Sequence, residues 1–251
     1  MTLAWQSGEY RRSYSILQRA ANGSDPHAGL RQIFEMMVGY ADPAAIPDNT
    51  ASTNIIRLRW FQSRLDEVLS FHEQDFALTN SVRTGLSVAA LLALTGRFQE
   101  SRDFFEALQQ QHKNVDTRAF FAAATGLSNV SRVAVVQLWV LTKLGRTVDA
   151  RRLERRLLER IHWSFESGAR DRTLYLAEAQ IHAIMGRNTE AMLSLRNALD
   201  GQFIRSVYLR RNPLLENLHT EPEFWSLIAE VETTLATIRQ DIEALRAGLA
   251  E

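Results

Sequence analysis

The chain has 251 residues, 45% of them hydrophobic, so it can bury a large core in one or two domains. Lysine plus arginine equals aspartate plus glutamate at 29 each, which argues against a global field that attracts nucleic acid or an anionic membrane. The absence of cysteine excludes disulfides, thiolate zinc sites and cysteine nucleophiles. No signal-peptide core precedes the first charged residues and no apolar run reaches membrane-spanning length, so we expect a cytoplasmic protein without membrane contact.

The N-terminal quarter contains one clear helix signal and one loop. Residues 8–20 look like the second half of a helical hairpin, so we expect the chain to begin inside a repeat. Asp25 followed by Pro26 is typical of an N-cap with proline at the first helical position, and it predicts a helix to about Tyr40. Residues 42–49 hold two prolines and are interpreted as a loop.

The centre of the chain is predicted to consist of long helices. Proline is absent between Asp48 and Asn212, which removes the strongest helix breaker from this region. One helix is expected over residues 52–71, and residues 70–73 have the S-x-x-E form of a capping box, where a new helix can begin. Hairpins are expected at three turn glycines: Gly96, Gly145 and Gly186. No sustained period-two alternation occurs, so the predicted fold class is all-α.

Residues 171–200 form the clearest two-helix unit. Apolar residues recur at helical spacing on both sides of its turn: Leu174, Leu176, Ala177, Ile181, Ile184, Ala191, Leu195, Ala198 and Leu199. A two-helix unit carries one apolar stripe on each helix and cannot bury both stripes alone. We therefore expect copies of the unit to stack side by side around a continuous core.

Alignment on the turn glycines places mostly small residues where the two helices of each hairpin should cross. The aligned pairs are Ala89 and Ser101, Leu138 and Ala150, and Ala179 and Ala191. This pattern, with Tyr175 at an aromatic position early in its hairpin, resembles the tetratricopeptide repeat (TPR), a hairpin of about 34 residues. The resemblance implies an α-solenoid, with irregular repeats because the turn glycines lie farther apart than one repeat. Leu138 departs from the pattern and should push its helices apart.

Residues 211–249 carry a second resemblance, to the segment that closes the TPR array in bacterial multidomain regulators. The matching elements are Asn212-Pro213-Leu214-Leu215, Leu218, Glu221-Pro222-Glu223-Phe224 and Arg239. In those regulators a winged-helix DNA-binding domain or a nucleotide cyclase domain precedes the repeats. Neither output domain occurs in this sequence, so the resemblance implies a sensing or interaction module.

The last helix is predicted to begin at residues 220–223, which have the T-x-x-E form of a capping box with proline in the first turn. Its apolar residues then repeat about every 3.5 residues, as in a coiled coil. We divide the chain into a TPR-like helical array over residues 1–220 and a capping or coiled-coil helix over residues 221–251. The first half of this helix is expected to dock on the last hairpin. The second half offers a seam for a homodimer: Ile238, Ile242, Leu245 and Leu249.

The leading functional interpretation is a protein- or peptide-binding scaffold, acting as the regulatory module of a bacterial signalling or transcriptional system. In TPR hairpins the first helix lines the concave surface, and the outward positions of these helices give a basic groove suited to an acidic or carboxylate ligand. The groove candidates are Arg83, Arg132, Trp139, Lys143 and Gln180. Simple packing or solvation of these positions, with Trp139 in the core, is favoured over a ligand groove.

No sequence motif supports an enzyme or a cofactor site. Phosphate-binding glycine loops and nucleophile elbows are absent from the sequence. Glu178 and His182 lie four residues apart and could share a metal, but a hydrogen bond on one helix face is favoured. His162 and Glu166 give no stronger signal. We therefore predict no catalytic, cofactor-binding or metal-binding residues.

The alternative function is nucleic-acid contact through the arginine-rich helix over residues 146–160. Its arginines are only partly offset by Asp149, Glu154 and Glu159: Arg146, Arg151, Arg152, Arg155, Arg156 and Arg160. Such a helix can contact phosphates. A solvated outer face with intrahelical ion pairs is favoured over this function, because no aromatic residues interleave with the arginines for base stacking.

Overall fold

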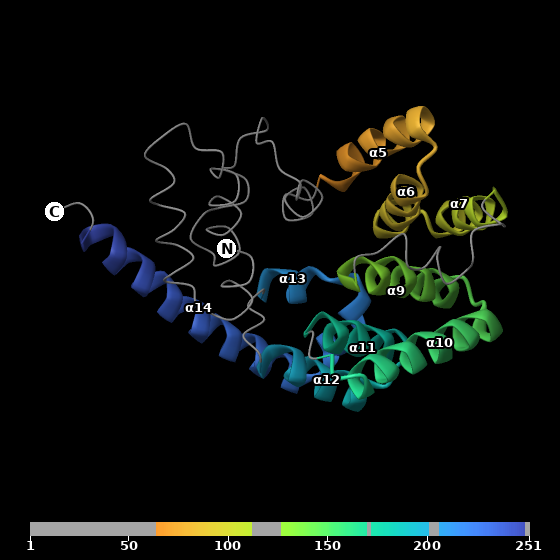
Figure 1. Ribbon diagram of the computed structural model, residues 1–251. Helices are drawn as coiled ribbons and strands as arrows, with labels where there is room; N and C mark the ends of the chain where they lie inside the picture. Colours follow the sequence, from red (N-terminus) through yellow and green to blue (C-terminus); the bar gives the residue numbers. More distant parts are fainter. Residues whose placement is uncertain (1–63, 112–126, 170–171, 201–205, 249–251) are drawn as a thin grey trace. The chain divides into compact units, whose positions relative to one another are not determined.

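The structure is a computed structural model that describes residues 64–111, 127–169, 172–200 and 206–248 (Figure 1). Every regular element within these ranges is a helix, and none of the described residues forms a strand. The all-α fold class is therefore confirmed. The helix and loop predicted before residue 50 lie outside the described residues. Among the described helices, none combines the length and apolar character that a membrane span requires.

The chain divides into two units, and each is described by itself. The larger unit comprises residues 64–197 and 213–221. Its elements are α5 (Leu65–Thr79), α6 (Val82–Leu94), α7 (Phe98–Gln111), α9 (Leu127–Lys143), α10 (Thr147–Glu166), α11 (Arg172–Ile184), most of α12 (Asn188–Asp200) and the 3₁₀ helix η2 (Pro213–Thr220). The described elements of the other unit are α13 (Ser206–Arg211) and α14 (Pro222–Gly248).

The three predicted glycine turns are present. Gly96, Gly145 and Gly186 have φ angles of 84°, 69° and 74°, a left-handed conformation that glycine adopts without strain. In each turn the glycine N–H donates to the carbonyl three residues back, and the next residue's N–H donates to the carbonyl five residues back. This pair of bonds is the Schellman motif, which ends one helix and lets the next begin at once. Gly168 ends α10 in the same way, although the sequence interpretation assigned it no turn.

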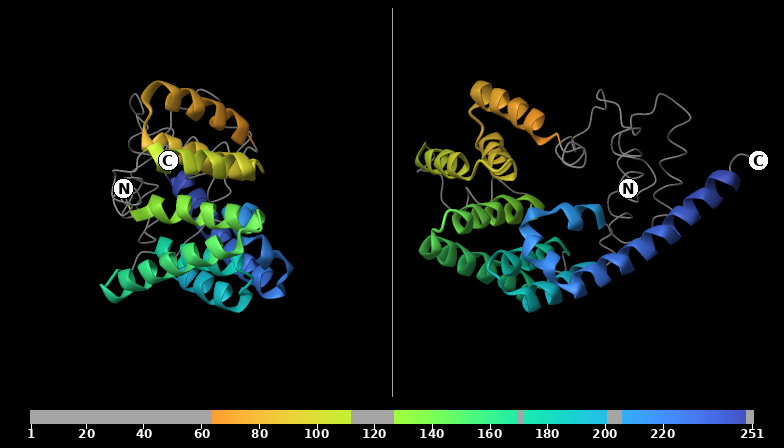
Figure 2. Two further views of the ribbon diagram at one scale, coloured as in Figure 1. Left: turned by 90° about the vertical axis from the view of Figure 1, so that its right-hand side faces the viewer. Right: turned by 180° about the vertical axis from the view of Figure 1, so that it is seen from behind.

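Helix α9 occupies the middle of the larger unit and packs against α6, α7, α10 and α11. Figure 2 shows this helix between the α6–α7 pair and the α10–α11 pair in two further views. Its inward side chains Val135, Leu138 and Val140 are almost completely buried. They belong to one hydrophobic core that extends from Ala93 in α6 to Leu214 in η2. This core joins α9, α10 and α11 with the end of α6, whereas Leu86, Ala89, Phe105 and Leu108 of the α6–α7 hairpin form a separate cluster.

The small residues aligned at the helix crossings are buried. Ala179 and Ala191 are both fully buried, which fits helices that approach closely at these positions. At the equivalent pair in the α6–α7 hairpin, the Ser101 hydroxyl donates to the Ala89 carbonyl oxygen at 2.6 Å. The two aligned positions of that hairpin are thus in direct contact.

The capping box predicted at residues 70–73 does not start a helix. These residues lie inside α5, which continues to Thr79. The helix stops at Asn80, which has a φ of 50° and donates its N–H to the Phe76 carbonyl oxygen at 2.8 Å. Asparagine tolerates the left-handed conformation better than most residues, so Asn80 supplies the C-cap that glycine supplies elsewhere.

Helix α14 has almost the extent that the sequence predicts, from Pro222 to Gly248. Thr220 is not its cap, because Thr220 ends η2 and its hydroxyl donates back to the Asn217 carbonyl oxygen at 3.1 Å. The apolar stripe of α14 is buried as far as its side chains are described: Phe224, Leu227, Ile228, Val231, Leu235 and Ile238. The side chains of Ile242 and Leu245, together with Leu249, lie outside the described residues, so the dimer seam stays a prediction.

Candidate functional site

Helix α10 has one buried face and one cationic face. Its apolar residues recur in steps of three and four, so Ala150, Leu157 and Ile161 are buried in the core of the larger unit. The opposite positions carry arginines, and all of them are exposed: Arg151, Arg152, Arg155, Arg156 and Arg160. The sequence pattern thus places a dense group of guanidinium groups on a rigid helix whose orientation is fixed by its buried side.

Three of these arginines and one tryptophan form what we call the cationic stripe: Arg152, Arg156, Arg160 and Trp163. Steps of four, four and three residues keep these positions within about 80° of the helix circumference. The Trp163 side chain lies at the end of the stripe, and the residue is 66% exposed. An exposed tryptophan beside free guanidinium groups is a common composition for a binding surface.

The charges of the cationic stripe are only partly compensated. Asp149 pairs with Arg146 at 2.7 Å and lies 3.8 Å from Arg152. In the part of the chain that the structure describes, no carboxylate pairs with Arg156 or Arg160. The predicted intrahelical ion pairs therefore cover only the first turn of α10. Beyond it, the guanidinium groups face solvent and are available to an anionic partner.

The buried side of α10 is tied to the next hairpin by an ion pair. Glu154 is the one carboxylate on the inward face of α10, and it pairs with Arg187 from the turn between α11 and α12. The Arg187 Nε donates to His182 Nδ1 at 3.0 Å. Burial, and then the positive charge of Arg187, lowers the pKa of His182, so this imidazole is neutral near pH 7 and accepts the bond.

A second polar link holds the last turn of α10. His162 Nε2 lies 2.9 Å from Glu178 Oε1 in α11, and Ser194 in α12 donates to the other Glu178 oxygen at 2.9 Å. Glu178 and His182 therefore have separate partners and do not bond to each other as the sequence interpretation favoured. No group of metal-binding side chains gathers among the described residues. The two links instead fix where α10 presents Trp163, the neighbour of His162.

The predicted basic groove is only partly accessible. Trp139 is 6% exposed and Gln180 is 2% exposed, so neither side chain offers a surface to a ligand in this structure. Lys143 is near the surface, where its ammonium lies 5.9 Å from the Trp139 ring centroid and pairs with Glu216 of η2. Arg83 is exposed on α6, and the side chain of Arg132 lies outside the described residues. The structure thus joins Trp139 and Lys143, and the groove as a whole stays a prediction.

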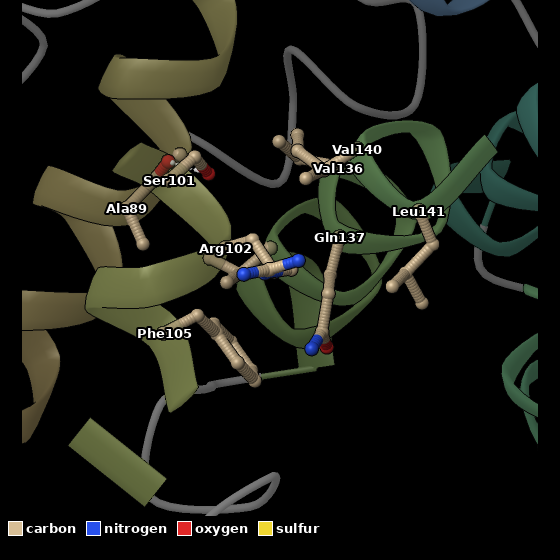
Figure 3. Close-up of a pocket in the computed structure, with 10 residues that line it drawn as sticks. Ala89, Ser101, Arg102, Phe105, Val136, Gln137, Val140 and Leu141 are labelled. Atoms are coloured by element: carbon tan, nitrogen blue, oxygen red, sulfur yellow. Dashed lines mark hydrogen bonds between the residues drawn. The ribbon is translucent and has the colours of Figure 1, made fainter. Parts of the chain in front are cut away.

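A small cavity lies between the α6–α7 hairpin and α9 (Figure 3). Ala89 and Ser101 line one side of it, and Val136 and Val140 line the other. Its volume is about 10 Å³, which is near the lower limit for one water molecule. This cavity is too small for a metabolite. We place the candidate site on the exposed face of α10 because its uncompensated guanidinium groups lie there.

Comparison with known proteins gives no further assignment. No protein-family model matches the chain, and no match is found among curated proteins or solved structures. The candidate function is therefore inferred from the geometry of α10. The sequence interpretation missed Trp163, although its spacing from Arg160 and Arg156, three and seven residues, marks the same helix face.

Proposed function

We propose that this protein is a binding scaffold, built from helical hairpins, that holds an acidic protein partner on the cationic stripe of α10. The observation that carries the proposal is the pair of exposed guanidinium groups, Arg156 and Arg160, without carboxylate partners in the described part of the chain and beside the exposed Trp163. Arginine binds carboxylates through two parallel hydrogen bonds, and arginine and tryptophan are enriched among residues that dominate protein interfaces.

The scaffold part of the proposal is supported by the repeated turn and by packing between hairpins. Three helix pairs share the same glycine turn between their helices, and one core joins α9 and α10 with α11 and the end of α6. Arrays of this kind present extended binding surfaces on a rigid frame. We propose that the pairs form a TPR-like solenoid, and that the chain serves as an interaction module in a bacterial signalling or transcriptional system rather than as an enzyme.

Nucleic-acid binding is the second candidate function, and Trp163 is the observation that favours it. An aromatic side chain next to arginines can stack on a base while the guanidinium groups contact phosphates. The balanced total charge of the chain gives no long-range attraction for a polyanion, and we therefore rank this function below protein binding.

The proposal is tested by titrating the full chain with a fluorescein-labelled oligoglutamate peptide and, separately, with a labelled oligothymidylate, following fluorescence anisotropy. Arg156→Glu should weaken peptide binding about tenfold, because it replaces a favourable charge contact with a repulsive one. Arg151→Glu is the matched control, since Arg151 is also exposed on α10 but lies outside the cationic stripe. Equal losses in both variants would remove the assignment to the stripe. Tighter binding of the oligothymidylate would select the second candidate.

A further inference from the structure

The spacing of the cationic stripe defines the shape of the ligand that fits it. Arg152, Arg156 and Arg160 follow one another at steps of four residues, which is about 6 Å along a helix axis. Trp163 follows three residues later, about 4.5 Å further along. An extended polypeptide places alternate side chains on the same face about 6.6 to 6.8 Å apart. The arginine steps are thus within about 1 Å of this repeat, and the step to Trp163 is about 2 Å shorter, a difference that two large aromatic side chains can span.

From this match we infer the class of partner: an extended acidic segment with carboxylates at three alternate positions and an aromatic residue at the next alternate position. This inference rests on the proposed function and deepens it. The three carboxylates lie opposite Arg152, Arg156 and Arg160. The aromatic side chain packs on Trp163, where rings in offset or edge-to-face contact gain affinity beyond the area they bury.

The backbone of α10 at Trp163 is held in place independently of any ligand. The neighbouring His162 is held by Glu178, and Ser164 on the other side is buried and donates its hydroxyl to the Arg160 carbonyl oxygen at 2.9 Å. The helix backbone that carries Trp163 is therefore anchored by the His162–Glu178 contact, while the residue itself stays exposed. A helix that is ordered before binding loses less conformational freedom in the complex, which favours affinity.

Two carboxylates beside the cationic stripe favour a polypeptide over a nucleic acid. Asp149 lies at the start of the stripe, and Glu159 lies at its edge one turn before Trp163. A nucleic-acid strand carries a phosphate at every nucleotide and would bring negative charge close to both. A peptide can place neutral residues opposite them, because its acidic side chains occupy only alternate positions.

The inference is tested with capped heptapeptides and the full chain, by isothermal titration calorimetry at low ionic strength. The first peptide alternates Glu and Ser and ends in Phe. A second peptide has the reverse order, because an extended chain can lie along α10 in either direction. Control peptides replace Phe by Ser, or group the three Glu residues together. One of the two Phe peptides should bind about tenfold tighter than either control.

Trp163→Ala should remove this preference for Phe, whereas Trp225→Ala, which deletes an exposed tryptophan on α14, should keep it. If all acidic peptides bind equally well and Arg156→Glu weakens them all, the inference is overturned and the proposed function stands. If no acidic peptide binds, both fail. If an oligothymidylate binds more tightly than the peptides and this binding depends on Trp163, the partner is a nucleic acid and the inference of a polypeptide is overturned.

Discussion

Arg187, in the turn between α11 and α12, forms an ion pair with Glu154 in the middle of α10. Arginine follows the turn glycine in the two earlier hairpins as well, but Arg97 pairs with Glu100 and Arg146 pairs with Asp149, each three residues further along the same helix. Only at Arg187, among these three turns of the described chain, does the arginine reach a different hairpin. The same residue type at the same turn position thus has a local role twice and a bridging role once.

Removing Arg187 should destabilise the protein because it leaves Glu154 buried without its cation. Glu154 is 11% exposed and Arg187 is 35% exposed at their side chains. We therefore expect Arg187→Ala to cost about 2 kcal/mol, below the roughly 3 to 5 kcal/mol measured for fully buried pairs. Chemical denaturation of the full chain measures this. Arg97→Ala is the control and should change stability little, since that pair is exposed. Equal effects would contradict the bridging role.

The crossing of α11 and α12 should not tolerate a larger side chain. Ala191 is fully buried, and Ala191→Leu adds volume where the core has no space. Overpacking of this kind typically costs about 1 to 3 kcal/mol. Leu193→Ala on the same helix removes a 63% exposed side chain and should have little effect in the same urea titration. A neutral Ala191→Leu variant would show that the helices do not cross closely at this position.

Gly186 should be replaceable by asparagine more readily than by alanine. A Cβ at this position would meet no atom within 4 Å, so any loss of stability comes from its φ of +74° and not from a clash. Gly186→Ala should cost about 1 kcal/mol, the usual penalty for an ordinary residue in the left-handed conformation. Gly186→Asn should cost less. Equal thermal stability of the three proteins would argue against the strain account.

The free energy of unfolding should decrease as the pH falls, because His182 becomes protonated. Burial and the charge of Arg187 lower the pKa of His182 in the folded state, although Glu178, Glu190 and Glu154 act in the opposite direction. The unfolded chain therefore binds the proton more readily, so the stabilisation is present above the unfolded pKa near 6.5 and is lost as pH falls below it. Wild type should lose more unfolding free energy between pH 8 and pH 5 than His182→Gln. Parallel pH profiles would exclude this contribution.

The parts of the fold that follow local rules can be predicted from sequence. The turns at Gly96, Gly145 and Gly186 are visible because glycine supplies a conformation that other residues avoid, and because helical periodicity is clear on both sides of each turn. The same rule applies to Gly168, where the Ser167-Gly168 pair is a turn signal that the periodic pattern of α10 hides.

Local sequence patterns give wrong or no predictions where tertiary packing determines the structure. The capping-box pattern at Ser70 is overridden because its neighbours Val68 and Leu69 are buried, and α5 continues through it. The Glu154–Arg187 pair joins residues from different hairpins, so helical spacing within α10 gives no sign of it. For Trp163 the sequence predicts the wrong environment, because tryptophan at a helical spacing usually occupies a buried position. Only the structure shows that it is exposed.

The central claim, that α10 is the binding face, is tested most directly by photo-crosslinking. An acidic peptide carrying a photoreactive phenylalanine analogue is irradiated with the full chain, and the adducts are located by mass spectrometry. We predict adducts within residues 156–163 of α10 that are lost in Arg156→Glu. Adducts concentrated instead around Lys143 of α9 and η2 would contradict the account and place the ligand in the groove predicted from sequence.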